Sequence, residues 1–519
     1  MRGELLSTNS FPPRGARICH GHKLLSVTPD TVSNHRSQRP IVVPGRNAWR
    51  SAQADKLAFL VDGAAYFHWL AKALQLARRE IWIVGWDFYP DIRLHSEAEP
   101  GPTVGEILRE LVDKHPDLNI RILIWAMGPI YSSKSLKLFT RGGWSDHPRI
   151  HLRFDTRHAL RGAHHQKMVV IDDSIAFAGG IDLTIGRWDD RNHAADSKHR
   201  LTPGGEPYDP VHDIQAAVSG GAAREIGEVA RRRWKLATGE EIVAGNSQAP
   251  CWPDGLAADI SGCRVAVART EPALFGSKGK REAIRLTHDA VKAARRHIYI
   301  ETQYLASFGV ARTLARRLRE ADGPEVVILV TESSRGLIEE FVMGRNRNRL
   351  IRRLKRADAR GRLRIMYPVV PEADGSERQV LIHSKIVIID DRFVRVGSSN
   401  LNNRSEGLDT ECDIAIEARN EAERSAITRF RDDLLAEHLD AEPEAVARIV
   451  ERTGSLVKAL DRLNVRPRGV RPFAVRPQDG KTSALPATGI LDPRMPFWPM
   501  QHFRKRVGTL ASRLFGGLF

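Results

Sequence analysis

Residues 165–172, HQKMVVID, have a second copy at residues 383–390, HSKIVIID, and both stretches read His-x-Lys-x-x-x-x-Asp. Each copy continues with a pair of small residues and then an acid or an amide: Gly179-Gly180 and Asp182 in the first, Gly397-Ser398 and Asn400 in the second. One His-x-Lys in a strand occurs readily by chance. Two full copies with the same continuation indicate a shared chemical role.

Each copy predicts a short buried strand that ends in a turn. Lys167 is followed by apolar, partly β-branched residues, and Asp172-Asp173-Ser174 then supplies turn-forming residues. Residues two apart on a strand share a face, so His165 should lie beside Lys167 and His383 beside Lys385. We expect the small pairs to let backbone N–H groups approach an anion closely. The pattern therefore predicts a site for an anionic substrate.

The duplicated motif resembles the H-x-K-x4-D-x6-G-[GS] hallmark of the phospholipase D superfamily. Further stretches are similar to the branch that cleaves phosphatidylcholine: residues 85–90, 179–190, 210–213 and 298–304, and Arg404-Ser405 with Asp409 and Glu411. The resemblance covers about residues 55–440, which is most of the chain.

An internal duplication explains the spacing of the two copies. His165 and His383 are 218 positions apart, and the first strands that we expect, at Ile81 and Ile298, are 217 apart. That period is too long for a solenoid repeat. We predict an α/β fold with two similar α-β-α sandwich lobes related by this duplication, packed about a pseudo-twofold axis with the active site at their interface. Both motifs would then surround one phosphate.

Four segments are predicted along the chain: a mobile N-terminal arm over residues 1–50, a first lobe over 51–257, a second lobe over 258–440, and a helical, Pro/Arg-rich extension over 441–519. Residues 501–519 of the extension place Phe503, Val507, Leu510 and Leu514 on one face of a basic amphipathic helix. Such a helix either lies in an anionic membrane interface or docks on the protein's own surface, and the pattern fits both.

The chemistry expected of this inventory is a two-step displacement at phosphorus. A histidine nucleophile divides the reaction into two steps through a covalent phosphohistidine, and the second histidine acts as general acid and then base. The resemblance implies His165 as the nucleophile and His383 as the acid/base, a choice that the symmetry of the sequence does not make. Lys167 and Lys385 are expected to hold the nonbridging oxygens.

The remaining site residues follow from motif position. The resemblance suggests Asp213 as the orienting carboxylate of His165 and Glu411 as that of His383. Gly180, Ser398 and Asn400 are expected to contact substrate. Asp172 and Asp390 fall on the strand face opposite the histidines and are expected to be structural, as is Asp182, because an ionised carboxylate would repel a phosphate. Arg404-Ser405 could either trim the phosphate pocket or brace its loop.

Composition bounds the partners. The formal net charge of +17 and the pI near 10.0 favour polyanions, with an anionic phospholipid membrane surface as the first choice and nucleic acid as the second. Four scattered cysteines predict neither a disulfide framework nor a zinc site, and no metal, cofactor or obligatory protein partner is inferred. No apolar run approaches about 18 residues, and no signal peptide is recognised. We therefore expect a cytoplasmic, peripherally membrane-associated protein, or one exported without a Sec signal.

The predicted function is that of a phospholipase D. It would hydrolyse the terminal phosphodiester of a glycerophospholipid, with phosphatidylcholine as the first candidate, to phosphatidic acid and the free headgroup, and could transfer the phosphatidyl group to other alcohols. The alternatives are a phosphatidyltransferase similar to cardiolipin synthase and a phosphodiesterase or nuclease. Two intact motifs argue against a lipid-binding module with a dead site.

Overall fold

The computed structural model describes residues 39–132, 143–245, 252–274, 278–333, 343–485, 488 and 492–495. The first repeat contains β1 (Arg50–Val61), α1 (Asp62–Leu74), β2 (Glu80–Gly85), α2 (Val104–Lys114), β3 (Asn119–Trp125), α3 (Gly128–Ser132), the short 3-10 helix η2 (Gly143–Ser145), β4 (Ile150–Asp155), β5 (Met168–Ile171), β6 (Ile175–Gly179), β7 (Val211–His212), β8 (Ile214–Ser219) and α4 (Gly221–Thr238).

The second repeat has a matching order of elements. It contains β9 (Ile260–Glu271), β10 (Lys280–Arg281), α5 (Glu282–Ala293), β11 (His297–Thr302), α6 (Phe308–Arg319), β12 (Glu325–Val330), α8 (Arg345–Ala357), β13 (Leu363–Pro371), β14 (Glu377–Gln379), β15 (Leu381–Ile382), β16 (Ile386–Ile389), β17 (Phe393–Gly397), β18 (Glu411–Glu417) and α9 (Glu421–His438). Two helices and a strand follow: α10 (Pro443–Thr453), α11 (Leu456–Leu463) and β19 (Gly469–Pro472).

Strand pairing repeats in the two halves. The first half is ordered β4-β3-β2-β5-β6-β8-β1, and the second β13-β12-β11-β16-β17-β18-β9. The register repeats as well, since Ile81 faces Ile171 in the first half and Ile298 faces Ile389 in the second. This confirms the predicted α/β fold of two similar lobes.

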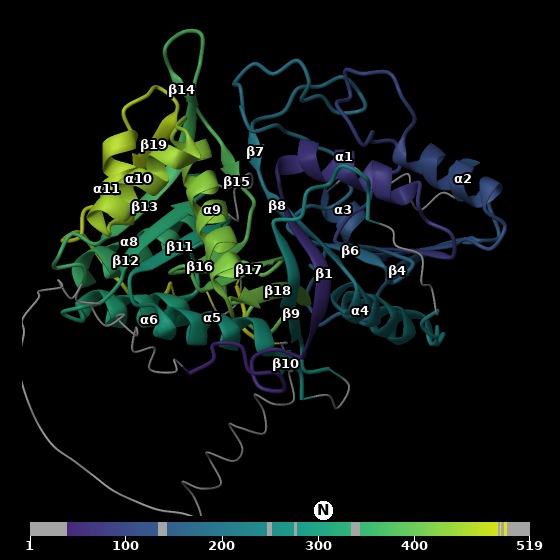
Figure 1. Ribbon diagram of the computed structural model, residues 1–519, viewed down its shortest axis with the longest axis horizontal. Coiled ribbons are helices and arrows are strands. Elements are labelled where there is room, and N and C mark those ends of the chain that lie inside the picture. Colours follow the sequence, from purple (N-terminus) through teal and green to yellow (C-terminus); the bar gives the residue numbers. More distant parts are fainter. Residues whose placement is uncertain are drawn as a thin grey trace, which may run out of the picture. The chain divides into compact units, whose positions relative to one another are not determined.

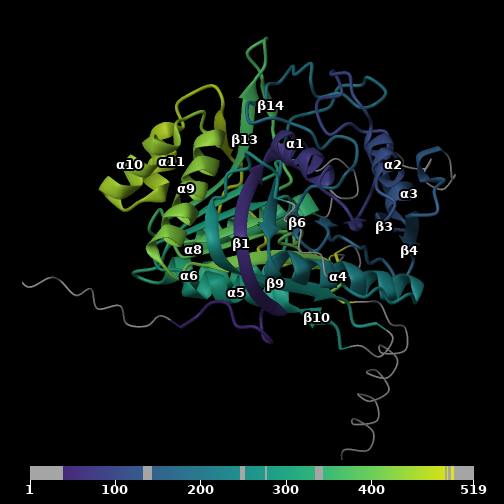
Figure 2. The same ribbon diagram turned by 45° about the vertical axis from the view of Figure 1, so that its right-hand side comes forward.

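The two halves join through their first strands. β1 pairs with β9 in antiparallel fashion, from Arg50 opposite Val267 to Leu57 opposite Ile260. Antiparallel pairing of equivalent strands is what a twofold axis between the repeats produces. In Figure 1 the first repeat lies on the right and the second on the left, with β1 and β9 between them, and in the turned view of Figure 2 β1 again runs beside β9.

Helices cover both faces of the strands, which explains why the strands are almost wholly apolar. In the first lobe, α1 and α2 pack on one face. In the second lobe, α5, α6 and α8 do the same. The opposite face forms a core shared by both lobes under α4, α9 and α11. Two ring contacts anchor this core, Trp82 edge-on to Trp234 of α4 and Phe59 stacked on Phe430 of α9.

The segment just before β1 is anchored to the second lobe. The backbone N–H groups of Ile41 and Val42 donate to the Glu417 carboxylate, and Ile41 is buried. Residues 40–49, which the sequence assigns to a mobile arm, are therefore packed. The predicted amphipathic helix over residues 501–519 lies outside the described residues. Among the described residues, no helix is both long and apolar enough to span a bilayer.

Candidate active site

Short cross-lobe pairings position both motif histidines. The N–H of His165 donates to the Thr410 carbonyl, 2.9 Å away, and Thr410 lies directly before Glu411. The N–H of His383 donates to the His212 carbonyl, 2.8 Å away, and His212 lies directly before Asp213. β15 and β7 extend the second pairing as a two-stranded parallel ladder. Each histidine therefore enters the site beside the carboxylate-bearing segment of the other lobe.

The orienting carboxylates are exchanged between the lobes. His165 Nδ1 lies 3.1 Å from Glu411 Oε2, and His383 Nδ1 lies 2.6 Å from Asp213 Oδ2. The expected assignment, Asp213 to His165 and Glu411 to His383, is wrong. It placed each carboxylate with the histidine of its own repeat, whereas the cross-lobe pairing carries each one to the histidine of the other repeat.

The lysines of both lobes influence the pKa of both motif histidines. Burial lowers the pKa of His165 well below its ordinary value, and Lys167 and Lys385 lower it further. Burial likewise depresses the pKa of His383, with added contributions from Lys385, Arg187 and Lys167. Because each imidazole feels the lysine of the other lobe, both motifs face one site. Burial also lowers the pKa of Lys385 to about 7.

Both lysines donate to the carbonyl oxygen of their own histidine, and their other partners differ. Lys167 Nζ lies 3.1 Å from Asp182 Oδ2, and both side chains are almost fully buried. Lys385 Nζ contacts His383 at its Nδ1, 3.3 Å away, and at its carbonyl oxygen. Asp182 thus pairs with a lysine, and it also accepts the Trp86 N–H. Its counterpart Asn400 has a buried side-chain oxygen with no hydrogen-bond partner among the described residues.

Burial raises the pKa of both orienting carboxylates. Burial raises the pKa of Glu411 to about 7, although the hydroxyls of Ser398 and Ser405 lower it. Burial also raises the pKa of Asp213, against the lowering effect of Lys385 and Arg187. Arg187 was not singled out by the sequence reading, and its Nε is buried with no hydrogen-bond partner among the described residues. The sequence signal that could have identified Arg187 is its position five residues after Asp182.

The small residues make room for the carboxylates. A Cβ at Gly180 would lie 2.0 Å from Asp213 Oδ1, and one at Gly397 would lie 2.1 Å from Asp413 Oδ1. The N–H of Gly180 donates to the Ile214 carbonyl and that of Ser398 to Asp413 Oδ1, so the expectation that these N–H groups are offered to an anion is wrong. The reason is that both are already used to hold the adjacent strand.

The Ser398 side chain is hydrogen-bonded to Glu411 in the structure. Its hydroxyl donates to Glu411 Oε2 at 2.5 Å and accepts the Cys412 N–H at 3.0 Å. The first lobe has Gly180 at this position, so the two halves of the site support their carboxylates differently.

The motif aspartates serve the fold. Asp172 accepts the N–H groups of three consecutive residues at the start of β2, Arg78, Arg79 and Glu80. Asp390 does the same for Arg295, Arg296 and His297 at the start of β11. Both have positive φ, 52° and 54°.

Arg404 braces its loop. The guanidinium forms a two-point contact with Asp409, at 3.0 and 2.9 Å. Asp409 Oδ1 in turn accepts the Ala163 N–H at 2.7 Å, close to His165. Of the two roles that the sequence left open, the structure favours the brace.

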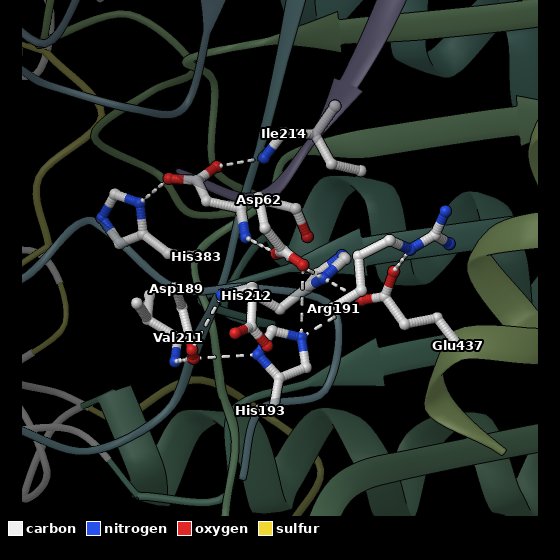
Figure 3. Close-up of polar contacts among 12 residues, drawn as sticks. Asp62, Asp189, Arg191, His193, Val211, His212, Ile214, His383 and Glu437 are labelled. Atoms are coloured by element: carbon white, nitrogen blue, oxygen red, sulfur yellow. Dashed lines mark hydrogen bonds and ion pairs between the residues drawn. The ribbon is translucent and has the colours of Figure 1, made fainter. Parts of the chain in front are cut away.

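A buried network of acids and imidazoles lies behind His383 (Figure 3). His212 Nε2 lies 3.0 Å from Glu301 Oε2, and its Nδ1 faces Asp62 and Glu437 at 3.1 and 2.8 Å. His193 Nε2 also reaches Glu437, at 3.1 Å. Burial lowers the pKa of both rings, but the carboxylates outweigh it: they raise the pKa of His193 to about 9 and that of His212 well above its ordinary value, which favours the charged form of each ring.

This network includes side chains of the types that bind metal ions in proteins. The ligand atoms of Asp62, His193, His212 and Glu437 all lie within 4.8 Å of one another. Protons on the two imidazoles balance the carboxylates in the arrangement described. The sequence analysis did not identify Asp62 or Glu437, because no local motif marks them.

The matching family profiles cover the two motifs. Residues 147–251 match a profile described as phospholipase D, and residues 288–434 match one described as cardiolipin synthase, PLD-like domain. The chain belongs to the phospholipase D superfamily. It carries two domains of that superfamily, one in each lobe.

Individual relatives are distant. The chain is 24% identical over 463 residues to phospholipase D A of Dictyostelium discoideum, covering 76% of this chain and 35% of that protein. It is 23% identical over 466 residues to phospholipase D2 of Bos taurus, covering 67% and 47% respectively. The chain therefore spans less than half the length of these relatives. The crystal structure of a phosphatidylserine synthase from Haemophilus influenzae Rd KW20 is 14% identical, with a TM-score of 0.49 over 80% of this chain and 96% of that one.

Proposed function

We propose that this superfamily phosphodiesterase is a phospholipase D that hydrolyses a glycerophospholipid, with phosphatidylcholine as the first substrate to test. The observation that supports this most directly is the meeting of two His-x-Lys pairs from the two lobes, each histidine oriented by a carboxylate of the other lobe. The names of the curated relatives support the choice of substrate class. Conversion to phosphatidic acid and free headgroup is the expected reaction.

His165 is the nucleophile in this proposal. Its Nδ1 lies 3.0 Å from the Ser398 carbonyl oxygen, and because a carbonyl only accepts hydrogen bonds, Nδ1 carries the proton. Nε2 of the neutral ring is then the atom with a free lone pair. It forms a bond to phosphorus while the bond between phosphorus and the headgroup oxygen breaks, which leaves a phosphohistidine.

His383 is the acid and then the base. It gives a proton to the departing headgroup oxygen, and later takes one from a water whose oxygen attacks phosphorus and breaks the N–P bond. An alcohol in place of water yields a phosphatidylalcohol. Burial and then the neighbouring cations depress the pKa of His383. An incoming phosphate anion offsets the cations and so raises this pKa toward the range in which the ring can donate a proton.

Lys167 and Lys385 stabilise the charge that develops on the nonbridging oxygens. Lys167 pairs with Asp182, so its charge is partly offset, whereas Lys385 contacts the ring Nδ1 of His383. Asn400 is the proposed polar contact for the phosphate, because its side-chain amide N–H groups can donate to a nonbridging oxygen, whereas its unpartnered buried oxygen is an acceptor and does not bond to an anion. The proposed partner is an anionic phospholipid surface, in keeping with the net charge of +17.

The test is headgroup release from phosphatidylcholine vesicles that contain some anionic lipid, with a primary alcohol added and with EDTA present. Choline release together with a phosphatidylalcohol supports the proposal, and His165→Ala should abolish both products and any covalent phosphate label. If choline stays on the lipid while phosphatidylglycerol is consumed, a phosphatidyltransferase replaces the proposal. Cleavage of plasmid DNA instead would make the protein a nuclease.

A further inference from the structure

A short piece of the C-terminal extension lies against the loop that carries Asn400. We call residues 488 and 492–495 the C-terminal strap and residues 400–409, between β17 and β18, the Asn400 loop. Asp492 accepts the Asn403 N–H at 3.1 Å with one carboxylate oxygen and the Arg404 N–H at 3.0 Å with the other. The side chain is buried, with Asp492 only 1% exposed. The Asp492 carboxylate, which lies outside the Asn400 loop, therefore holds a backbone turn of that loop.

The strap contacts the loop at a second point. Arg494 Nε lies 2.7 Å from Glu406 Oε2, and Arg494 also donates to the Asn403 side-chain oxygen at 3.2 Å. The other oxygen of Glu406 accepts the hydroxyl of Ser307, which caps the N-terminus of α6. A Cβ at Gly407 would come within 2.9 Å of the Arg494 carbonyl oxygen, so the close approach of strap and loop needs a glycine there.

The strap is itself anchored in the second lobe. The Asp492 N–H donates to the Thr488 carbonyl at 2.9 Å, and the Thr488 hydroxyl accepts a hydrogen bond from Asn346 of α8 at 2.8 Å. Asn346 is fully buried. These contacts fix the position of the Asp492 carboxylate relative to α8.

The Asn400 loop reaches the site through Ser405. The hydroxyl of Ser405 accepts the Asn400 N–H at 3.2 Å, and it lies close enough to Glu411 to lower the pKa of that carboxyl. Glu411 orients His165. Ser405 directly follows Arg404, whose N–H the strap holds, so a shift of the turn moves the support of both Asn400 and Glu411.

We propose that Asp492 is a positioning residue of the active site: it fixes the Asn403–Arg404 turn, and through Ser405 it sets the placement of Asn400 and Glu411. Asp492 lies beyond both family-matched segments, residues 147–251 and 288–434. The C-terminal extension is therefore part of the working site. This inference rests on the proposed function, because it assigns Asn400 and Glu411 their roles in catalysis.

Substitution of Asp492 should impair turnover more than substrate binding. In Asp492→Asn one oxygen remains an acceptor and the other becomes an amide donor facing an N–H, so one of the two turn contacts is lost at nearly constant volume. We expect kcat to fall about 10-fold or more with KM within about twofold of wild type, since a small misplacement of catalytic groups costs that much. Arg494→Ala should change kcat in the same direction by a smaller factor.

The matched control is Asp461→Asn, which removes a carboxylate of the same extension that pairs with Arg364 at the surface of α11 and lies outside this chain of contacts. It should keep wild-type kcat and KM. Each variant is purified as the full chain and its thermal unfolding midpoint is measured. An Asp492→Asn protein that unfolds with the wild-type midpoint and has wild-type kcat would overturn the inference.

A double-substitution cycle distinguishes positioning from a general structural effect. If Asp492 acts through Ser405, the combination of Asp492→Asn with Ser405→Ala should be no more than about twofold slower than Ser405→Ala alone, because coupled residues are not additive. If the two losses of kcat instead multiply in the double variant, Asp492 acts by a route other than Ser405 and the proposal is wrong. Arg494→Ala combined with Ser405→Ala repeats the test if Asp492→Asn proves unstable.

The assays use phosphatidylcholine and, in parallel, bis(p-nitrophenyl) phosphate, a diester without a lipid. Wild-type cleavage of the second compound alone would refute the lipid assignment while the Asp492 comparison proceeds on that compound. Loss of rate in Asp492→Asn on both substrates supports the inference. Wild-type enzyme that cleaves neither would refute both proposals together.

Discussion

The exchange of carboxylates between lobes makes a residue-level prediction. Because Glu411 orients His165, Glu411→Gln should slow formation of the phosphohistidine. Asp213→Asn misorients His383, so it should slow hydrolysis of the phosphohistidine, and also its formation where the leaving group needs a proton. Each should lower kcat by about 10²-fold or more. Rapid quenching with phosphorus-labelled bis(p-nitrophenyl) phosphate, whose leaving group departs without a proton from His383, should therefore show accumulated phosphoenzyme in Asp213→Asn and none in Glu411→Gln. Phosphoenzyme that accumulates in Glu411→Gln and not in Asp213→Asn would contradict this prediction. It would mean either that each carboxylate orients the histidine of its own repeat or that the two histidines have exchanged roles.

Gly180 offers a steric test of the same contact. Alanine there would place a Cβ 2.0 Å from Asp213 Oδ1, and overpacking of this kind costs about 1–3 kcal/mol or displaces the obstacle. Displacing Asp213 from His383 should lower kcat at least 10-fold. Gly245→Ala is the matched control, since a Cβ at Gly245 meets nothing within 4 Å. Equal activity of the two variants, measured by headgroup release, would show that the Asp213 position is not critical.

The site residues show where sequence reasoning succeeds and where it fails. His165, Lys167 and their repeats are marked by a local motif, and strand geometry alone places each pair on one face. The partner of each histidine is not local. Glu411 is 246 positions from His165 and reaches it through a cross-lobe contact that no spacing within one repeat can show.

At the scale of elements, two aspartates hold the starts of equivalent strands. Asp172 and Asp390 each accept three consecutive backbone N–H groups, which alanine would leave without a partner. We expect Asp172→Ala and Asp390→Ala each to lower the free energy of unfolding by roughly 1–3 kcal/mol. Urea unfolding measures this, with the exposed Asp113→Ala as control, because its ion pair with Arg109 contributes little. A loss in only one of the two would mean that the repeats are not equivalent here.

Element prediction follows the same division between local and distant signals. The expected strands at Ile81 and Ile298 correspond to β2 and β11, because each has its own apolar run. The packing of residues 40–49 was not predicted. Its causes are distant carboxylates: Glu417 accepts two backbone N–H groups, and Asp289 accepts from the side chains of Arg46 and Asn47.

At the scale of the whole molecule, the buried network joins the lobes. Asp62 and His212 belong to the first repeat, and Glu301 and Glu437 to the second. His193 adds a further imidazolium, paired with Asp189 at 2.9 Å and with Glu437. Five separated stretches of chain supply these groups, which explains why the sequence does not reveal the network. Its charge state should therefore govern how firmly the lobes hold together.

The pH dependence of stability tests that role. The folded pKa of His193 is raised to about 9 from an ordinary value near 6.5, so its stabilising effect is complete below about pH 6.5 and is lost as pH rises through 9. The effect at pH 6 should be roughly 3 kcal/mol, from about 1.4 kcal/mol per unit of pKa. Lys385 titrates in the opposite sense, since its folded pKa is lowered to about 7. The wild type must therefore be compared with His193→Gln, in which the Lys385 contribution is shared and cancels.

Urea unfolding of both proteins between pH 6 and 10 provides the comparison. The wild type should be more stable than His193→Gln at pH 6, and the difference should shrink by most of its value between pH 7 and 10. His199→Gln is the control, because His199 contacts Ser96 and lies outside the network of acids, so its difference from wild type should not follow this curve. A wild-type advantage over His193→Gln that stays constant across the range would mean that His193 is not held as an imidazolium, and that the lobes are joined by packing rather than by charge.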